Sequence, residues 1–201
     1  MPEQPRVDPH ERLKTPLSAR FDEALVLAST LHRAQARKAS GVPYVAHLLG
    51  VASLVLEEGG SEEMAIAALL HDAAEDQGGE EILTRISKTF GSEVARWVRQ
   101  SSDSFVLPKP EWETRKRHHM AAIPGADREA RLIMLADKVH NARSILADHA
   151  RVGAEVWDRF SVPRERTVWY YETLLEIFER ELSPVLYDTL SECVRRMKEL
   201  N

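Results

Sequence analysis

Residues 68–79 read ALLHDAAEDQGG, and this stretch decides how the chain is interpreted. It begins as an apolar helical segment and ends at a glycine pair, which is a typical helix stop. Between the two lie four residues whose side chains can bind a metal ion or transfer a proton: His71, Asp72, Glu75 and Asp76. We interpret the acids as crowding the last turns of one helix, where the negative end of the helix dipole disfavours each by about 0.3–1 kcal/mol. A bound cation would offset that repulsion.

Apolar residues recur at helical spacing on both sides of this stretch. No period-2 run of β-branched residues indicates a strand. The fold class predicted is therefore all-α, a bundle of about eight to ten helices. The apolar stripes cover residues 21–31, 49–56, 64–72, 82–90, 94–98, 132–142, 167–182 and 184–200.

Length and composition bound the class of protein. The 201 residues suffice for one hydrophobic core, so we expect a single domain over 19–201 after a polar, proline-rich, disordered tail over 1–18. The formal charge of −5 argues against a nucleic-acid partner. With one cysteine, Cys193, no secretory signal and no membrane-spanning apolar run, we predict a cytoplasmic protein that does not bind membranes. Assembly into a homo-oligomer is left open.

His71 and Asp72 are adjacent, so on a helix they point about 100° apart and need further ligands to grip one ion. Two candidates are His47 in PYVAH and Asp137 in MLADKVHN. Imidazole and carboxylate together suit Mn, Fe or Zn. A His–Asp pair alone is a weak signal, since chance or a satisfied polar pair explains most cases. The wider HDxxED pattern strengthens the metal interpretation.

Further polar residues suggest what a metal site would act on. Glu75 and Asp76 lie one turn beyond His71 and Asp72, where they suit a general base or a water-positioning role. Basic groups at 37–38 and 115–117 favour phosphate recognition, although a solvated helix face also explains the second group. The remaining histidines of the second half are interpreted as surface residues: His118, His119, His140 and His149.

Six motifs occur in order: RK at 37–38, GVPYVAH at 41–47, AALLHDAAED at 67–76, FG at 90–91, RK at 115–116 and LADKVHN at 135–141. This set resembles the HD-domain alarmone hydrolases. These are the hydrolase domain of the bifunctional Rel/Spo stringent-response proteins and their stand-alone small relatives. The similarity covers roughly residues 20–180 and is more specific than the His–Asp pair alone.

The resemblance implies an HD-type helical fold and an enzyme, a (p)ppGpp 3′-pyrophosphohydrolase that releases pyrophosphate and GDP or GTP. It implies Mn²⁺ as the cofactor, with the ligand set His47, His71, Asp72 and Asp137. Glu75 and Asp76 occupy the positions of the catalytic acids. The implied partner is a small nucleotide substrate, bound by Arg37, Lys38, Lys116, Asn141 and Tyr170, with Trp169 as an alternative to Tyr170.

Departures from the family pattern leave other functions open. HDAAED stands for the usual HDTVED, and SSDS keeps only Asp103 of a Thr-Asp-Asp motif. One alternative is an HD-domain phosphohydrolase for another nucleotide, such as NADPH or a deoxynucleotide. A second is a non-catalytic nucleotide-binding module in which the metal has only a structural role. A third is an antitoxin with the same hydrolytic chemistry.

Overall fold

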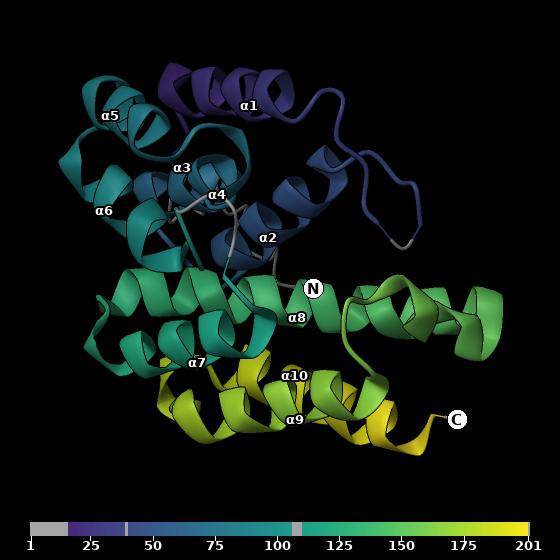
Figure 1. Cartoon of the computed structure of the whole chain (residues 1–201). Helices are drawn as coiled ribbons and strands as arrows, with labels where there is room; N and C mark the ends of the chain where they lie inside the picture. The colour runs from purple at the N-terminus through teal and green to yellow at the C-terminus, as the bar shows by residue number, and fades with distance from the viewer. Residues whose placement is uncertain (1–15, 39, 106–109, 201) are drawn as a thin grey trace, which may run out of the picture.

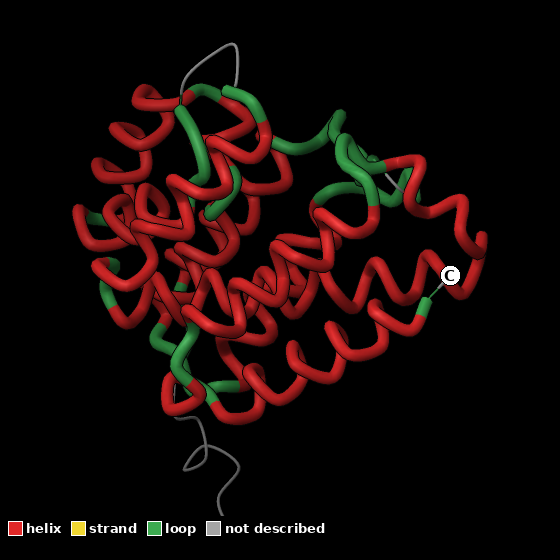
Figure 2. Tube along the Cα trace, turned by 60° about the horizontal axis from the view of Figure 1, so that its bottom comes forward, coloured by secondary structure: helices red, strands yellow, loops and turns green. Residues whose placement is uncertain are grey.

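The computed structural model describes residues 16–38, 40–105 and 110–200. Within these ranges it contains helices and loops and no strand (Figure 2), which confirms the all-α prediction. Most of the expected tail, residues 1–15, lies outside the described residues. The α-helices are α1 (Ala19–Leu31), α2 (Val45–Glu57), α3 (Glu62–Leu70), α4 (Ala73–Gln77), α5 (Gly79–Phe90), α6 (Ser92–Ser101), α7 (Trp112–Ala122), α8 (Arg128–Val152), α9 (Arg164–Ile177) and α10 (Pro184–Glu199).

The long helix α8 organises the bundle. It crosses the middle of the molecule, with α1 to α6 on one side and α7, α9 and α10 on the other (Figure 1). It contacts α2, α3 and α6 on the first side and α10 on the second. No described helix is both long enough and apolar enough to cross a membrane.

Helix α3 lies at the centre of the first group. Every residue from 64 to 70 is buried, as expected for a segment that is apolar all round. Ser61 begins the helix by accepting a hydrogen bond from the backbone N–H of Met64 at 3.2 Å, which satisfies one of the free donors of the first turn. The end of α3 therefore delivers His71 directly to the interior of the molecule.

The structure corrects the expectation of one continuous helix through residues 64–77. Helix α3 ends at Leu70, a turn follows at His71 and Asp72, and the short α4 begins at Ala73. Glu75 and Asp76 consequently lie in the first turn of α4 and not in the last turns of a long helix. His71 and Asp72 thus belong to the connection between two helices, and Glu75 and Asp76 follow them on the second one.

Two other boundaries differ from the apolar stripes. The predicted helix over 167–182 ends at Ile177, because Phe178 adopts an extended backbone and a short 3-10 turn (Arg180–Leu182) follows. A helix that no stripe marked, α7, spans Trp112–Ala122 and carries the basic group at 115–117. At the junction of α5 and α6, Gly91 has φ +100°, a conformation that side-chain-bearing residues rarely adopt.

Candidate active site

Three buried side chains converge between α2, α3 and α8. Nε2 of His47 lies 3.1 Å from Oδ1 of Asp137, and Nε2 of His71 lies 3.7 Å from the same oxygen. The three ligand atoms all lie within 4.8 Å of one another, so they form a possible metal-binding site. Oδ2 of Asp72 lies 3.5 Å from the first imidazole and 3.1 Å from the second. The turn after α3 brings this fourth expected ligand to the same point.

The hydrogen bonding of His71 shows what this cluster can bind. Its Nδ1 lies 2.7 Å from the carbonyl oxygen of Ala68, a contact that requires the proton on Nδ1. In the neutral imidazole, which is the form that binds a metal, Nε2 then presents a lone pair to two carboxylates, and it is buried without a hydrogen-bond partner. Lone pairs that face one another repel unless a cation lies between them. The donor set therefore fits a divalent metal ion that accepts nitrogen and oxygen ligands.

The electrostatics of the cluster point in the same direction. Burial lowers the pKa of His71, but the Asp72 and Asp137 carboxylates outweigh burial and hold this pKa well above its usual range. Burial raises the pKa of Asp137, but Lys138, His47 and His71 outweigh it and hold this carboxyl pKa well below its usual range. The carboxylates therefore stay ionised and attract positive charge, whether a proton or a metal ion.

Neighbouring groups orient the two carboxylates. Lys138 Nζ donates to Oδ2 of Asp137 at 2.6 Å, which leaves Oδ1 facing the imidazoles. Tyr44 Oη donates to Oδ2 of Asp72 at 2.6 Å. Burial and the Asp72 charge raise the Tyr44 pKa far above its usual value, so this phenol remains a donor. Hydrogen bonds of this kind hold ligating carboxylates in place.

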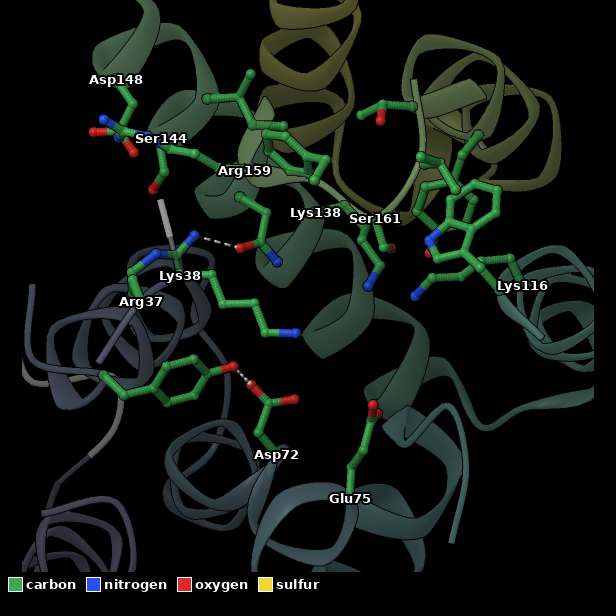
Figure 3. Close-up of a pocket in the computed structure, with 18 of the residues that line it drawn as sticks. Arg37, Lys38, Asp72, Glu75, Lys116, Lys138, Ser144, Asp148, Arg159 and Ser161 are labelled. Carbon is green, nitrogen blue, oxygen red and sulfur yellow. Dashed lines mark hydrogen bonds between the residues drawn. The ribbon is translucent and has the colours of Figure 1, made fainter. Parts of the chain in front are cut away.

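A pocket of about 710 Å³ opens next to this cluster. Asp72 and Glu75 lie at one end, and Ser144, Asp148 and Arg159 lie at the other (Figure 3). Among the described residues, six basic side chains line it although the chain carries a net charge of −5: Arg37, Lys38, Arg115, Lys116, Lys138 and Arg159. A local excess of cations in an acidic protein suits a small polyanion.

Glu75 and Asp76 line the pocket beside the cluster, and different elements hold them. Glu75 accepts the backbone N–H of Asp103 at 3.1 Å and lies 3.7 Å from Nη1 of Arg115. Asp76 accepts a hydrogen bond from Nε2 of Gln35 at 2.8 Å. Each carboxylate is thus restrained at the edge of the cluster, where a water molecule could be oriented or deprotonated.

The residues expected to bind substrate all line the pocket. Arg37 Nη2 donates to Oδ1 of Asn141 at 2.8 Å, and the Asn141 amide donates to Asp137, so this pair borders the cluster. Lys38 extends towards the middle of the cavity (Figure 3). Lys116 lies 5.1 Å from the ring centroid of Tyr170. Tyr170 lines the pocket, whereas Trp169 packs on Trp112 and Arg117, which favours the tyrosine of the two alternatives.

A protein-family sequence model described as an HD domain matches residues 24–163, which is more than half of the chain. The chain belongs to the HD-domain family. The HD-domain part of the resemblance inferred from its motifs is therefore confirmed, and the relatives described next support the rest. The match covers every residue of the cluster and most of the pocket, and Tyr170 lies beyond it.

Relatives of this HD domain include nucleotide pyrophosphohydrolases. It is 37% identical over 131 residues to guanosine-3′,5′-bis(diphosphate) 3′-pyrophosphohydrolase MESH1 of Mus musculus, covering 64% of this chain and 70% of that protein. It is 32% identical over 161 residues to a probable enzyme of the same description from Synechocystis, covering 76% of this chain and 21% of that protein. A solved structure described as a metazoan ortholog of SpoT that hydrolyzes ppGpp has a TM-score of 0.73 and 29% identity, covering 90% of this chain and 97% of that one.

Two histidines of the HD domain contradict the surface interpretation. His119 is 4% exposed, on the side of α7 that faces the interior. His140 is half-buried, with its Nδ1 2.9 Å from Nδ1 of His47. Helical periodicity missed both because charged neighbours surround them in the sequence. For His140, the only available signal was its place inside the LADKVHN motif.

Asp103 is a further residue that the sequence analysis left without a role. Its buried carboxylate pairs with Arg115 and, at 2.6 Å, with Nζ of Lys116. Burial raises the pKa of this carboxyl, but Lys116 and Arg115 outweigh burial and lower it. Asp103 therefore links two parts of the site: its carboxylate binds the basic group of α7, and its backbone N–H donates to Glu75.

Proposed function

We propose that this protein is an enzyme that hydrolyses ppGpp and pppGpp at the 3′ position and releases pyrophosphate with GDP or GTP. One observation carries the proposal: two buried imidazoles, the buried Asp137 carboxylate and the half-buried Asp72 carboxylate face one another at the acidic end of a cation-lined pocket. Such a site combines a place for a divalent metal with a place for a phosphorylated nucleotide. The relatives described as ppGpp pyrophosphohydrolases support the choice of substrate.

We assign the metal to His47, His71, Asp72 and Asp137, and propose Mn²⁺ as the physiological ion. Nitrogen and carboxylate oxygen donors suit manganese as well as iron or zinc, and the family resemblance favours manganese. When bound, the ion would polarise a phosphate oxygen and lower the pKa of a bound water. The side chains of the pocket would carry out proton transfer and hold the substrate.

Glu75 or Asp76 would take a proton from the attacking water or align it. The water oxygen forms a bond to the phosphorus on the 3′ oxygen, the bond from that phosphorus to the 3′ oxygen breaks, and the 3′ oxygen gains a proton. Lys116, with Arg115 beside it, would carry part of the phosphate charge during in-line attack. Arg37, Lys38, Asn141 and Tyr170 would hold the nucleotide in register with the cluster.

The biological setting belongs to the same proposal. We expect the enzyme to act in the cytoplasm, in the stringent response, on a free nucleotide and without nucleic acid. The unpaired, buried thiol of Cys193 supports a reducing compartment. Assembly into a homo-oligomer stays a prediction.

The proposal is tested by incubating the Mn²⁺-loaded protein with ppGpp and resolving the products by ion-exchange chromatography. We expect GDP and pyrophosphate from the wild type, and neither product from Asp72→Ala, which removes a ligand. Turnover by an Asp72→Ala protein that holds no metal would refute the site assignment. Metal binding without cleavage of ppGpp would refute the substrate, and NADPH and deoxynucleotides would then be assayed in the same way.

A further inference from the structure

We propose that His140 is a positioning residue that fixes the tautomer and the orientation of His47 for metal binding, and that Gly50 is glycine in order to admit the His140 ring. The inference rests on the metal site of the proposed function. It adds an outer partner on α8 to a ligand on α2.

The hydrogen bond between the two imidazoles sets the tautomer. Nε2 of His47 faces Asp137 at 3.1 Å and Asp72 at 3.5 Å, so Nε2 is the atom that would bind a cation. A neutral imidazole that offers Nε2 as a ligand carries its proton on Nδ1. That N–H points at Nδ1 of His140, 2.9 Å away. His140 must therefore accept with Nδ1 and carry its own proton on Nε2.

The two expected ligand histidines have different acceptors for the proton on Nδ1. His71 donates from Nδ1 to the carbonyl oxygen of Ala68, three residues earlier on its own helix. His47 relies on a residue 93 positions away, and the two rings lie 4.8 Å apart between centroids. Outer partners of metal-bound histidines fix ring orientation and raise ligand basicity. Contact with His140 therefore couples the geometry of His47 to α8, the helix that supplies Asp137.

Gly50 provides an independent observation. It lies on α2 one turn after His47, and a Cβ built at this position would overlap Cδ2 and Nε2 of the His140 ring. Glycine inside a helix lowers stability and calls for a packing reason. Close approach of the His140 ring to the backbone of α2 is that reason. Any side chain at position 50 would push the ring away from His47.

Mn²⁺ affinity of the purified full chain tests the role of His140, measured by the electron paramagnetic resonance signal of free Mn²⁺. We expect His140→Leu to weaken Mn²⁺ binding by about 10- to 100-fold, the usual effect of removing an outer partner. His140→Asn is the matched control, because its Oδ1 stands where Nδ1 of histidine stood. It should retain affinity within a few-fold. Equal affinity in wild type and His140→Leu would overturn the inference.

Gly50→Ala tests the same contact from the other helix. Alanine favours the helix, which offsets the cost of displacing the His140 ring, so we expect resistance to urea in EDTA close to that of the wild type together with weaker Mn²⁺ binding. In a His140→Ala background the same change should have no further effect on affinity, because no ring remains to be displaced. Additive losses, or a Gly50→Ala protein that binds Mn²⁺ like the wild type, would overturn the role of Gly50.

A tautomer readout separates positioning from general packing. The readout is the ¹⁵N NMR spectrum of the Zn²⁺-loaded protein with labelled histidines. We expect Nδ1 of His47 to resonate as a protonated nitrogen in the wild type and in His140→Asn. In His140→Leu this signal should shift or disappear. None of these measurements uses a nucleotide. A wild type that binds metal but leaves ppGpp intact would refute the proposed substrate and leave this inference standing. Wild-type Mn²⁺ affinity in His140→Leu would refute this inference and leave the proposed substrate standing.

Discussion

At the scale of single residues, the proposed mechanism separates groups that would hold the ion from groups that would act on water. His47, His71 and Asp137 are buried and face one another, whereas Glu75 is restrained at the pocket edge by Asp103 and Arg115. Replacing a residue of the second kind should therefore change the rate without emptying the metal site.

Glu75→Gln is expected to keep Mn²⁺ affinity and to lower kcat by about 10²- to 10⁴-fold, the usual contribution of a general base. The amide keeps the shape of the side chain but cannot accept the proton of the attacking water. Single-turnover kinetics with ppGpp, alongside a Mn²⁺ titration, measure both quantities. Unchanged turnover would remove Glu75 from the mechanism and leave Asp76 as the candidate base.

His119 illustrates a residue whose burial controls stability. Burial and the charges of Lys138 and Lys116 lower its pKa from the ordinary value of 6.5 to about 4, so the folded protein keeps this imidazole neutral. Between pH 6.5 and 4 the unfolded chain binds the extra proton. This contribution to the free energy of unfolding is therefore present above pH 6.5 and is lost as the pH falls towards 4.

We expect the loss from His119 to reach about 3 kcal/mol across that range, at 1.36 kcal/mol per pKa unit. Urea unfolding in EDTA at several pH values measures it. His119→Leu should show a shallower pH dependence between pH 6.5 and 4 than the wild type. A slope identical to that of the wild type would mean that His119 does not carry the effect.

At the scale of elements, short connections do most of the positioning. The turn between α3 and α4 presents His71 and Asp72 together. The loop between α1 and α2 carries Arg37 and Lys38, and its Gln35 also accepts from Gln77 and contacts His32 at 2.7 Å. That network ties the loop of Arg37 and Lys38 to Asp76, so the loop and the acid should move as one unit.

Helix α7 depends on Asp103 in a similar way. Asp103→Ala would leave Lys116 without this carboxylate and Arg115 with Glu75 alone in a largely buried setting, and loss of one partner of such a group costs about 3–5 kcal/mol. We expect a drop in the free energy of unfolding towards the lower end of that range, measured by urea titration, together with a raised KM for ppGpp. Glu80→Ala, which breaks an exposed pair with Arg99, is the control and should change neither quantity. Wild-type stability in Asp103→Ala would show that the cluster does not anchor α7.

At the scale of the whole molecule, the proposed metal site joins parts of the bundle that are distant in the chain. Its ligands come from α2, from the end of α3 and from α8, so the cluster can form only when those helices are packed. An ion that binds the folded state alone must therefore stabilise the entire domain.

Saturating Mn²⁺ is expected to raise the free energy of unfolding by about 2.7 kcal/mol at a hundredfold excess over Kd. Differential scanning calorimetry with and without EDTA measures the corresponding rise in Tm. In Asp137→Ala, which lacks a ligand, added Mn²⁺ should leave Tm unchanged. A metal-dependent rise of the same size in that variant would place the ion elsewhere.

The sequence by itself determined the all-α fold and the residues that meet at the site. Helical periodicity is a local property, and the affinity of imidazole and carboxylate for metals belongs to the side chains themselves. The in-order motifs added the family, because they fix the relative places of His47, His71, Asp72 and Asp137 along the chain. All eleven residues expected at the site lie in the cluster or line the pocket.

Only the tertiary structure decided the break at His71 and Asp72, the burial of His119, and the partners of Asp103 and His140. Local periodicity continues through residues 64–72, so it does not mark the turn that ends α3 there. Asp103 pairs with α7, and His140 meets His47 across 93 residues of sequence. Contacts between distant residues leave no periodic trace in the chain, and they become visible only when the helices have come together.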